Sequence, residues 1–253
     1  MDIQELRVNW DGLGKTDPLW AVLTAKGRRG NKWDQEAFFE TGRQELDAHL
    51  QRLQKLGLLP VLTRALDFGC GVGRFTQALT RHFAAVVGVD IAPSMIDLAD
   101  RFNAYPDRCN YILNDKDDLS VLQTESFSFV YSCITLQHIE PRYSKNYIKE
   151  FLRLLEPAGT LLFQVPAAQQ RVSLKQTIKA KIDTAFPGFA ASYRRLRHGG
   201  PWKMEMHCIP EPEVTKLVED SGGTVADVDR NVDEYGFLNV WYSVTKRRRQ
   251  KGQ

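Results

Sequence analysis

Three glycines at alternate positions follow an apolar segment near residue 65, and they constrain the fold more than any other feature of this chain. Residues 65–76 read ALDFGCGVGRFT, so a segment typical of a buried strand ends near the carboxylate of Asp67. The glycines that follow are Gly69, Gly71 and Gly73. Because glycine tolerates left-handed backbone conformations, the chain can turn sharply there and present N–H groups at the start of the next helix. The stretch predicts a strand, a ligand-binding turn and a helix.

A dinucleotide-binding turn follows a related pattern, G-x-G-x-x-G. Here Arg74 occupies the place of the third glycine, and Asp67 stands before the first. A carboxylate at that place would repel a pyrophosphate, whereas it can attract a cationic or hydrogen-bond-donating group. S-adenosyl-L-methionine carries an ammonium and a sulfonium, so we expect this cofactor rather than NAD.

The order D-x-G-x-G-x-G resembles the first motif of the class I S-adenosylmethionine-dependent methyltransferases. The resemblance implies an α/β fold with a Rossmann-like, doubly wound sheet of seven strands, mostly parallel with an antiparallel last strand. It also implies that Gly69, Cys70 and Gly71 lie against the methionine part of the cofactor. Asp67 would then help to hold the cofactor's amino group.

A second strand ending in a carboxylate follows the turn. Residues 84–90 (AAVVGVD) predict a short apolar strand that ends in Asp90, ahead of a helix that begins near Pro93. The resemblance implies that Asp90 holds the ribose hydroxyls, with Ile91 and Met95 as neighbouring cofactor contacts. An aspartate after a strand is also common as a turn or N-cap residue. The glycine turn one helix upstream favours the binding role.

The third predicted strand, residues 109–115 (CNYILND), ends in Asp115. The resemblance implies that Asp115 meets the exocyclic amine of adenine, with Lys116 and Asp118 beside it. A solvated acidic turn explains the same residues equally well. The fourth predicted strand covers residues 126–134, and Cys133 near its end is a further predicted cofactor contact.

The N-terminal residues 1–60 show no strand pattern, and leucines at helical spacing within residues 43–57 predict a helical N-terminal cap. Trp33 and Arg43 precede Asp67 at a spacing that resembles glycine N-methyltransferase. That resemblance implies that Arg43 pairs with the cofactor carboxylate, for which a guanidinium is the best protein partner. Trp33 would cover the methionine arm. The alternative is a helix-surface arginine and a core tryptophan.

The remaining pattern predicts one methyltransferase domain over residues 61–246, because strands alternate with helices. The further predicted elements are a helix at 143–155, a strand at 160–165 after the turn 157–159, a helix at 211–221, and strands at 224–230 and 237–245. Residues 167–206 interrupt the pattern and leave from a strand end, so we interpret them as an inserted substrate lid, with helix-forming residues around 174–185. A peripheral helical hairpin is the alternative. Residues 247–253 form a basic tail.

Two histidines are candidate catalytic bases, because an acceptor hydroxyl must lose a proton before or during methyl transfer. His138 follows the fourth predicted strand, where this fold brings the acceptor close to the methyl group, and it is also a candidate cofactor contact. His207 ends the predicted lid. The alternatives are a helix-capping or structural role for His138 and a satisfied polar residue at a strand entry for His207.

Composition narrows the class of protein. The chain has 253 residues, 43% of them hydrophobic, which suits one sizeable domain with short additions. Its formal net charge of +3 does not argue for binding to nucleic acid. The four cysteines are far apart, so the sequence predicts neither a metal site nor a disulfide framework. No apolar stretch is long enough to cross a bilayer, and no signal peptide is apparent. We expect a cytoplasmic protein.

The sequence thus predicts an enzyme that transfers a methyl group from S-adenosyl-L-methionine to a small-molecule acceptor. A hydroxyl of a sugar or natural product is favoured over an amine. A methyltransferase for protein or RNA, docking through the basic residues, is an alternative, as is a non-catalytic S-adenosylmethionine-binding partner or sensor. The acceptor and the oligomeric state are left open by the sequence.

Overall fold

The computed structural model describes residues 1–169 and 202–248. The predicted helix within the lid, most of the lid itself and most of the basic tail lie outside the described residues. Among the described helices, none combines the length and the apolar character needed to span a membrane.

A seven-stranded sheet forms the centre of the molecule, with the strand order β3-β2-β1-β4-β5-β7-β6. The strands are β1 (Arg64–Phe68), β2 (Ala85–Asp90), β3 (Cys109–Leu113), β4 (Phe127–Ser132), β5 (Leu155–Gln169), β6 (Gly223–Val232) and β7 (Phe237–Lys246). The first five strands run parallel, and β7 is antiparallel to both of its neighbours. The predicted fold class is confirmed.

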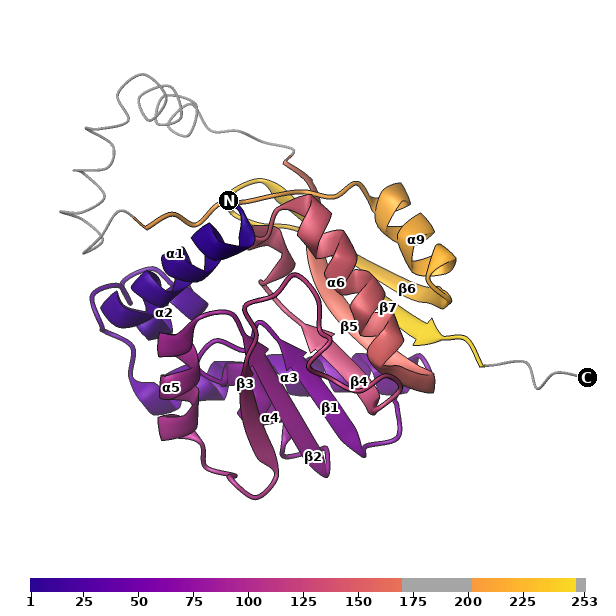
Figure 1. Cartoon of the computed structure of the whole chain (residues 1–253), viewed down its shortest axis with the longest axis horizontal. Coiled ribbons are helices and arrows are strands. Elements are labelled where there is room, and N and C mark those ends of the chain that lie inside the picture. The colour runs from indigo at the N-terminus through magenta and orange to yellow at the C-terminus, as the bar shows by residue number, and fades with distance from the viewer. Residues whose placement is uncertain (170–201, 249–253) are drawn as a thin grey trace, which may run out of the picture.

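The helices cover both faces of this sheet, as Figure 1 shows. They are α1 (Ile3–Thr16), α2 (Pro18–Val22), α3 (Gln35–Lys55), α4 (Arg74–Leu79), α5 (Pro93–Phe102), the 3-10 turn η1 (Leu136–His138), α6 (Pro141–Leu154) and α9 (Glu211–Asp220). Helices α3 and α4 pack on one face and α6 and α9 on the other. Side chains alternate across a strand. Ala65 therefore packs in the core under α3 and α4, and its neighbour Leu66 packs in the core under α6 and α9.

The N-terminal helices follow from local sequence signals. Helix α1 begins with a capping box, in which Asp2 accepts from the Glu5 backbone and the Glu5 side chain accepts from the Asp2 backbone. Helix α3 buries Leu46, Leu50 and Leu53 against the sheet, in agreement with their helical spacing. Helix α1 in turn packs against α2 and α5.

The start of β5 differs from the prediction. The expected turn at 157–159 lies within the strand as the structure has it, because Leu155 already pairs with Phe127. The chain then bulges at Ala158, which has a positive φ of 66°, and pairs again where Thr160 meets Phe129. A bulge and a turn share the same residue preferences, so the sequence pattern alone did not separate them.

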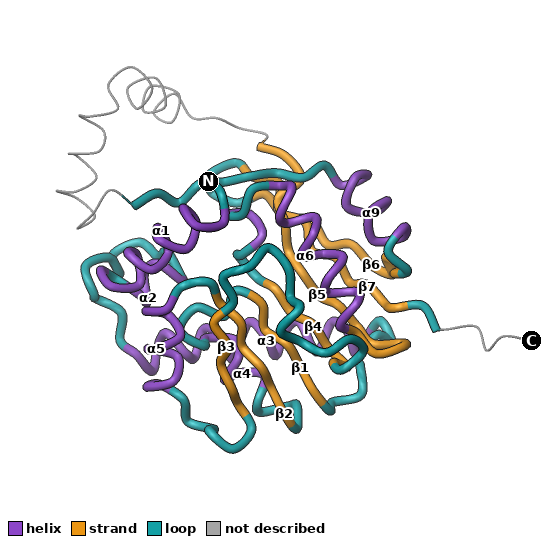
Figure 2. The backbone as a smooth tube through the Cα atoms, in the orientation of Figure 1, coloured by secondary structure: helices purple, strands orange, loops and turns teal. Residues whose placement is uncertain are grey.

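Parallel pairing brings the carboxyl ends of β1 to β5 to the same edge of the sheet. Figure 2 shows α1 and α2 beside this edge. In folds of this class, ligands bind outside the carboxyl ends of the strands. The site should therefore lie between these strand ends and the N-terminal helices.

Candidate active site

A cavity enclosing about 860 Å³ of space, counting its open mouth, lies at this edge. The strand ends and the turns after them contribute much of its wall, and α1 and α2 close it from the other side with Leu6, Trp10, Ala21 and Val22. The predicted site residues that line it are Gly69, Cys70, Gly71, Asp90, Ile91, Met95, Cys133 and His138. The structure thus brings together residues from the ends of three strands.

The glycine turn has the backbone geometry expected of it. Gly69, Gly71 and Gly73 have φ values of 74°, 54° and 87°, and Gly73 is the N-cap of α4. A Cβ atom on Gly69 would lie 2.1 Å from Thr135 Cγ2, and one on Gly71 would lie 2.5 Å from Val22 Cγ2. The glycines therefore allow both the turn itself and the close approach of the chains around the cavity.

Asp90 connects the end of β2 to the glycine turn. Its Oδ2 accepts from the Gly71 backbone N–H at 2.8 Å, and its Oδ1 accepts from the Ala92 N–H at 2.9 Å. Burial raises the pKa of Asp90, and these N–H donors partly oppose that rise. A carboxylate has about four lone-pair sites, so the backbone donors of Gly71, Ala92 and Ile91 leave at least one of them free. Asp90 can therefore accept hydrogen bonds from a ligand in the cavity without giving up its backbone contacts.

Asp67 lies beneath the turn and is not among the residues that line the cavity. Its side chain is 2% exposed and accepts from Thr76 Oγ1 at 2.6 Å, which joins β1 to α4. Burial raises the pKa of Asp67 to about 7, although the hydrogen bond from Thr76 and the charge of Arg74 act in the opposite direction. Its predicted contact with the cofactor amino group stays a prediction.

Arg74 also lines the cavity, although in the sequence it stands out only as a break in the glycine pattern. The residue is 2% exposed and lines the cavity, with Nη1 donating to Glu45 Oε2 at 3.0 Å and to Thr41 Oγ1 at 3.3 Å. Its Nε is buried without a hydrogen-bond partner in the described structure. A buried guanidinium with an unused N–H suits a ligand carboxylate. In the sequence, the signal for a cation at the cavity is the arginine directly after the glycine turn.

Trp33 and Arg43 lie outside the cavity lining. Arg43 pairs with Glu36 and with Glu40, both on its own helix α3. Trp33 donates from Nε1 to the Leu23 carbonyl at 3.1 Å and packs edge-on against Phe38. The structure gives both residues protein partners, and their cofactor contacts stay predictions.

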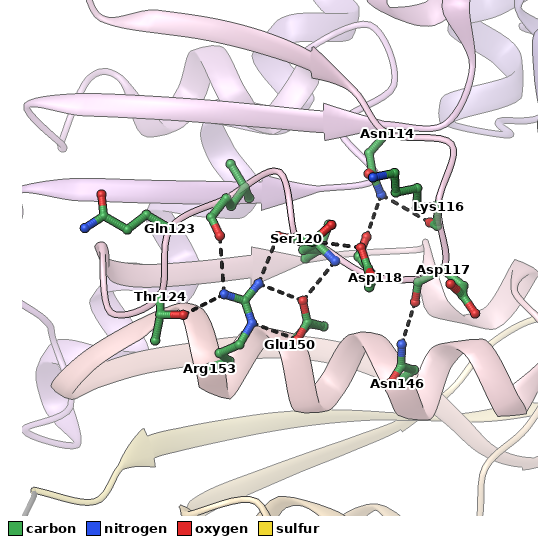
Figure 3. Close-up of polar contacts among 12 residues, drawn as sticks. Asn114, Lys116, Asp117, Asp118, Ser120, Gln123, Thr124, Asn146, Glu150 and Arg153 are labelled. Carbon is green, nitrogen blue, oxygen red and sulfur yellow. Dashed lines mark hydrogen bonds and ion pairs between the residues drawn. The ribbon is translucent and has the colours of Figure 1, made fainter.

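The loop after β3 is held in place from α6, as Figure 3 shows. Glu150 Oε2 accepts from the Leu119 N–H at 2.9 Å, and Arg153 Nη2 donates to the Leu119 carbonyl at 2.9 Å. Arg153 also donates to Thr124 Oγ1 at 2.8 Å. Asn146 donates to the Asp117 carbonyl at 2.6 Å. These contacts fix the loop that closes the β3 side of the cavity.

Asn114, rather than the acidic residues after it, lines the cavity at this loop. Its Nδ2 donates to the carbonyls of Lys116 at 3.2 Å and Asp118 at 2.9 Å, so its Oδ1 is free to accept from a ligand (Figure 3). Asp115 and Lys116 are exposed, and Asp118 accepts from the Ser120 N–H. The predicted adenine contacts of Asp115, Lys116 and Asp118 stay predictions.

His138 lies in the cavity wall at the end of η1, next to Trp10 with the ring centroids 5.2 Å apart. Its Nδ1 is 2.7 Å from the Glu205 carbonyl oxygen, which can only accept, so Nδ1 carries a proton. Burial lowers the pKa of His138 to about 4. The ring is therefore neutral near pH 7, with its lone pair on Nε2.

His207 is not part of the cavity lining. Its backbone N–H donates to the Gln137 carbonyl at 2.7 Å, and its Nε2 lies 3.5 Å from Glu205 Oε2. His207 thus helps to attach residues 202–209 to η1. Its predicted role as a base stays a prediction.

A Rossmann-like sheet with a glycine turn and a buried carboxylate at its carboxyl edge is typical of proteins that bind nucleotide-containing cofactors. Comparison with known proteins narrows the class: residues 65–159 match the family model described as a methyltransferase domain. This central part of the chain is thus similar to a methyltransferase domain.

Two curated relatives are similar over the central part of the chain. The malonyl-[acyl-carrier protein] O-methyltransferase of Priestia megaterium is 35% identical over 100 residues, which are 39% of this chain and 35% of that protein. The ubiquinone biosynthesis O-methyltransferase of Xanthomonas oryzae pv. oryzae is 32% identical over 111 residues, 42% of this chain and 45% of the relative. The chain thus spans less than half the length of either relative.

Solved structures share the fold over most of the chain. Magnesium protoporphyrin IX methyltransferase from Synechocystis PCC 6803, solved with bound S-adenosylhomocysteine, matches with a TM-score of 0.66 at 20% identity. The match covers 97% of this chain and 100% of that one. A putative sarcosine dimethylglycine methyltransferase from Galdieria sulphuraria matches with a TM-score of 0.59 at 16% identity, over 84% of this chain and 88% of that one.

Proposed function

We propose that the chain transfers a methyl group from S-adenosyl-L-methionine to a hydroxyl group of a small molecule. The observation that carries the proposal is a buried histidine, His138, whose Nδ1 faces the Glu205 carbonyl and which lines the same cavity as the glycine turn and Asp90. When bound, the cofactor supplies a methyl group on a positively charged sulfur. Two curated relatives are named O-methyltransferases, which supports an oxygen acceptor.

The cofactor would extend along the ends of the strands. Asp90 would accept from the ribose hydroxyls, and Asn114 Oδ1 would accept from the adenine amine. At the other end, the turn at Gly69–Gly71 would lie against the methionine part. Arg74 would meet the carboxylate with the N–H of Nε, which is buried and without a partner in the described structure. This assignment satisfies a buried donor that otherwise costs free energy.

The acceptor would lie between His138 and the N-terminal helices. Leu6, Trp10 and Ile139 make this side of the cavity apolar, which suits an acceptor with an apolar body and a reactive hydroxyl. His138 Nε2 would take the hydroxyl proton as the oxygen attacks the methyl group. Positioning supplies most of the acceleration in such a displacement, and proton transfer to a well-placed base adds roughly a hundredfold or more.

The test replaces His138 by glutamine and assays the acceptor found in the source extract. Radiolabelled S-adenosylmethionine is incubated with fractions of that extract, and the labelled product is identified by mass. We expect His138→Gln to lower turnover at least about a hundredfold. The dissociation constant of S-adenosylhomocysteine should stay within about twofold, because a lost base leaves the cofactor contacts intact.

His82→Gln is the matched control, because His82 pairs with Asp47 at 2.7 Å outside the cavity. It should retain full turnover. Equal turnover in His138→Gln and the native protein would remove His138 as the base. Stoichiometric cofactor binding without a labelled product in any fraction would overturn methyl transfer and favour a non-catalytic binding partner or sensor.

A further inference from the structure

Three amide side chains are buried near His138 and are hydrogen-bonded to one another. Gln137 on η1, Gln164 on β5 and Asn239 on β7 are 8%, 5% and 9% exposed. Buried amides of this kind are nearly always hydrogen-bonded, and each keeps the orientation that its partners demand. We call these three residues the amide chain, since each is bonded to the next.

Two partners with fixed hydrogen-bonding roles decide which end of each amide donates and which end accepts. The Ile134 backbone N–H, which can only donate, points to Gln164 Oε1 at 3.1 Å. The Asp233 carboxylate, which only accepts when ionised, receives Asn239 Nδ2 at 3.0 Å. Both anchors require that Asn239 Oδ1 faces Gln164 Nε2, and the distance between these atoms is 2.7 Å. The orientation of the buried amides therefore follows from the anchors at both sides.

The same order of donors and acceptors continues from Gln164 to His138. Gln164 Nε2 also donates to Gln137 Oε1 at 3.3 Å, so the other end of that amide, Nε2, faces His138 Nε2 at 3.2 Å. A proton on His138 Nε2 would place two donors against each other. The proton on Nδ1 instead donates to the Glu205 carbonyl at 2.7 Å. Both ring nitrogens thus have partners that favour one tautomer.

We propose that Gln137, Gln164 and Asn239, anchored by Asp233, are positioning residues that hold His138 in the Nδ1–H tautomer with its lone pair on Nε2. The inference rests on the proposed function, in which that lone pair accepts the hydroxyl proton. At 3.2 Å the contact from Gln137 is long, so an incoming hydroxyl can replace it. The proton would then move from the acceptor oxygen to Nε2 as the oxygen–methyl bond forms. The methyl–sulfur bond of the cofactor would break in the same step, with its electron pair staying on the sulfur.

The charged groups around the ring are compatible with this arrangement. Glu205 contributes its backbone carbonyl to the ring, while its carboxylate pairs with the N-terminal amino group at 3.1 Å. His207 acts against a charge on His138. No carboxylate is bonded to the His138 ring among the described residues. Burial lowers the pKa of His138 most, and it outweighs the Glu205 carbonyl, which favours a charged ring. The amide chain then decides which nitrogen keeps the proton.

Gln164 also supports the backbone at Ile134, and this role guides the choice of variant. Ile134 has a φ of 56°, a left-handed conformation that is unusual for a β-branched residue, and Gln164 Oε1 holds its N–H. A glutamate at position 164 would keep an oxygen for Ile134 but lose both N–H donors of the amide chain. Gln164→Glu thus tests the chain without removing the support of the strained backbone.

The experiment measures the ring protonation of His138 by ¹⁵N NMR on the full chain with labelled histidine. The chain has five histidines, and the His138→Gln spectrum identifies the signals of His138 by their absence. We expect the native spectrum to show a protonated Nδ1 and an unprotonated Nε2. In Gln164→Glu, Gln137 should turn its N–H toward the new carboxylate and its oxygen toward His138. Nε2 should then become protonated.

Turnover of Gln164→Glu should fall at least about tenfold, with the dissociation constant of S-adenosylhomocysteine within about twofold of the native value. The pKa of His138 in the NMR titration should rise. Gln77→Glu is the matched control, because Gln77 Oε1 also accepts a backbone N–H, that of Ala104 at 3.3 Å, outside the amide chain. It should change neither the ring spectrum nor turnover.

A native spectrum with the proton on Nε2 would overturn the inference without any substitution. So would a Gln164→Glu protein with the native tautomer and native turnover. Failure of the proposed function gives a different result, since the native protein would then produce no methylated product while the ring spectra still decide the tautomer.

Discussion

Replacement of Asp67 by asparagine should make the chain more stable at neutral and alkaline pH. Asp67 is buried beneath the glycine turn, and its only side-chain hydrogen bond to another side chain among the described residues comes from Thr76 Oγ1. An asparagine oxygen can accept the same bond. The substitution therefore removes a buried charge and keeps the contact between β1 and α4.

The direction of the pKa shift of Asp67 decides whether a rise in pH stabilises or destabilises the folded protein. Burial raises the pKa of Asp67 from 3.8 to about 7 in the folded protein. The folded state therefore binds more protons than the unfolded state between these values, and stability falls as pH rises through this window. One pKa unit corresponds to about 1.4 kcal/mol, so the native protein should lose about 2.5 kcal/mol from this group between pH 5 and pH 8.

Urea unfolding of the native protein and of Asp67→Asn at pH 5 and pH 8 measures this effect. Other titrating groups contribute equally to both proteins, so the difference between the two free energies of unfolding isolates Asp67. That difference should shift in favour of Asp67→Asn by about 2.5 kcal/mol from pH 5 to pH 8. A difference independent of pH, with equal denaturant slopes, would refute the reasoning and show that Asp67 is ionised at both values.

Two further predictions concern the cofactor. Asp90→Ala should raise the dissociation constant of S-adenosylhomocysteine at least about tenfold in calorimetry, because a carboxylate bonded to two hydroxyls contributes more than about 1.4 kcal/mol; unchanged binding would remove Asp90 from the ribose site. Arg74→Met should weaken binding by a similar factor, about tenfold, whereas Arg43→Ala should change it less than about threefold. A larger loss of binding in Arg43→Ala than in Arg74→Met would instead assign the cofactor carboxylate to Arg43, as its spacing from Asp67 suggested. Far-ultraviolet circular dichroism of both variants checks that each is folded.

Much of the fold was predictable because its signals are local. The apolar segments that end in Asp67 and Asp90 became β1 and β2, and the positive φ angles at Gly69, Gly71 and Gly73 follow from the glycines themselves. The start of β5 was less predictable, since a bulge in the strand and a turn before it use the same residue types.

The side chains that complete the site were harder to predict, because several of their partners are distant in sequence. Arg74 becomes a buried cation only when α3 places Glu45 and Thr41 against it. Asn114, instead of the more conspicuous Asp115, reaches the cavity because of how the loop after β3 folds back on itself and on α6. Sequence spacing could indicate which strand ends meet, but not which neighbouring side chain points inward.

The sequence alone determined the Rossmann-like sheet and the glycine turn and predicted the cofactor class, since these depend on backbone conformation and on residues close together in the chain. Only the tertiary structure decided the state of His138. Its tautomer depends on Glu205, on η1, and on amides contributed by β5 and β7. Hydrogen bonds among such distant segments form only when the sheet is assembled, and burial in that assembly is what lowers the pKa of the ring and leaves it neutral.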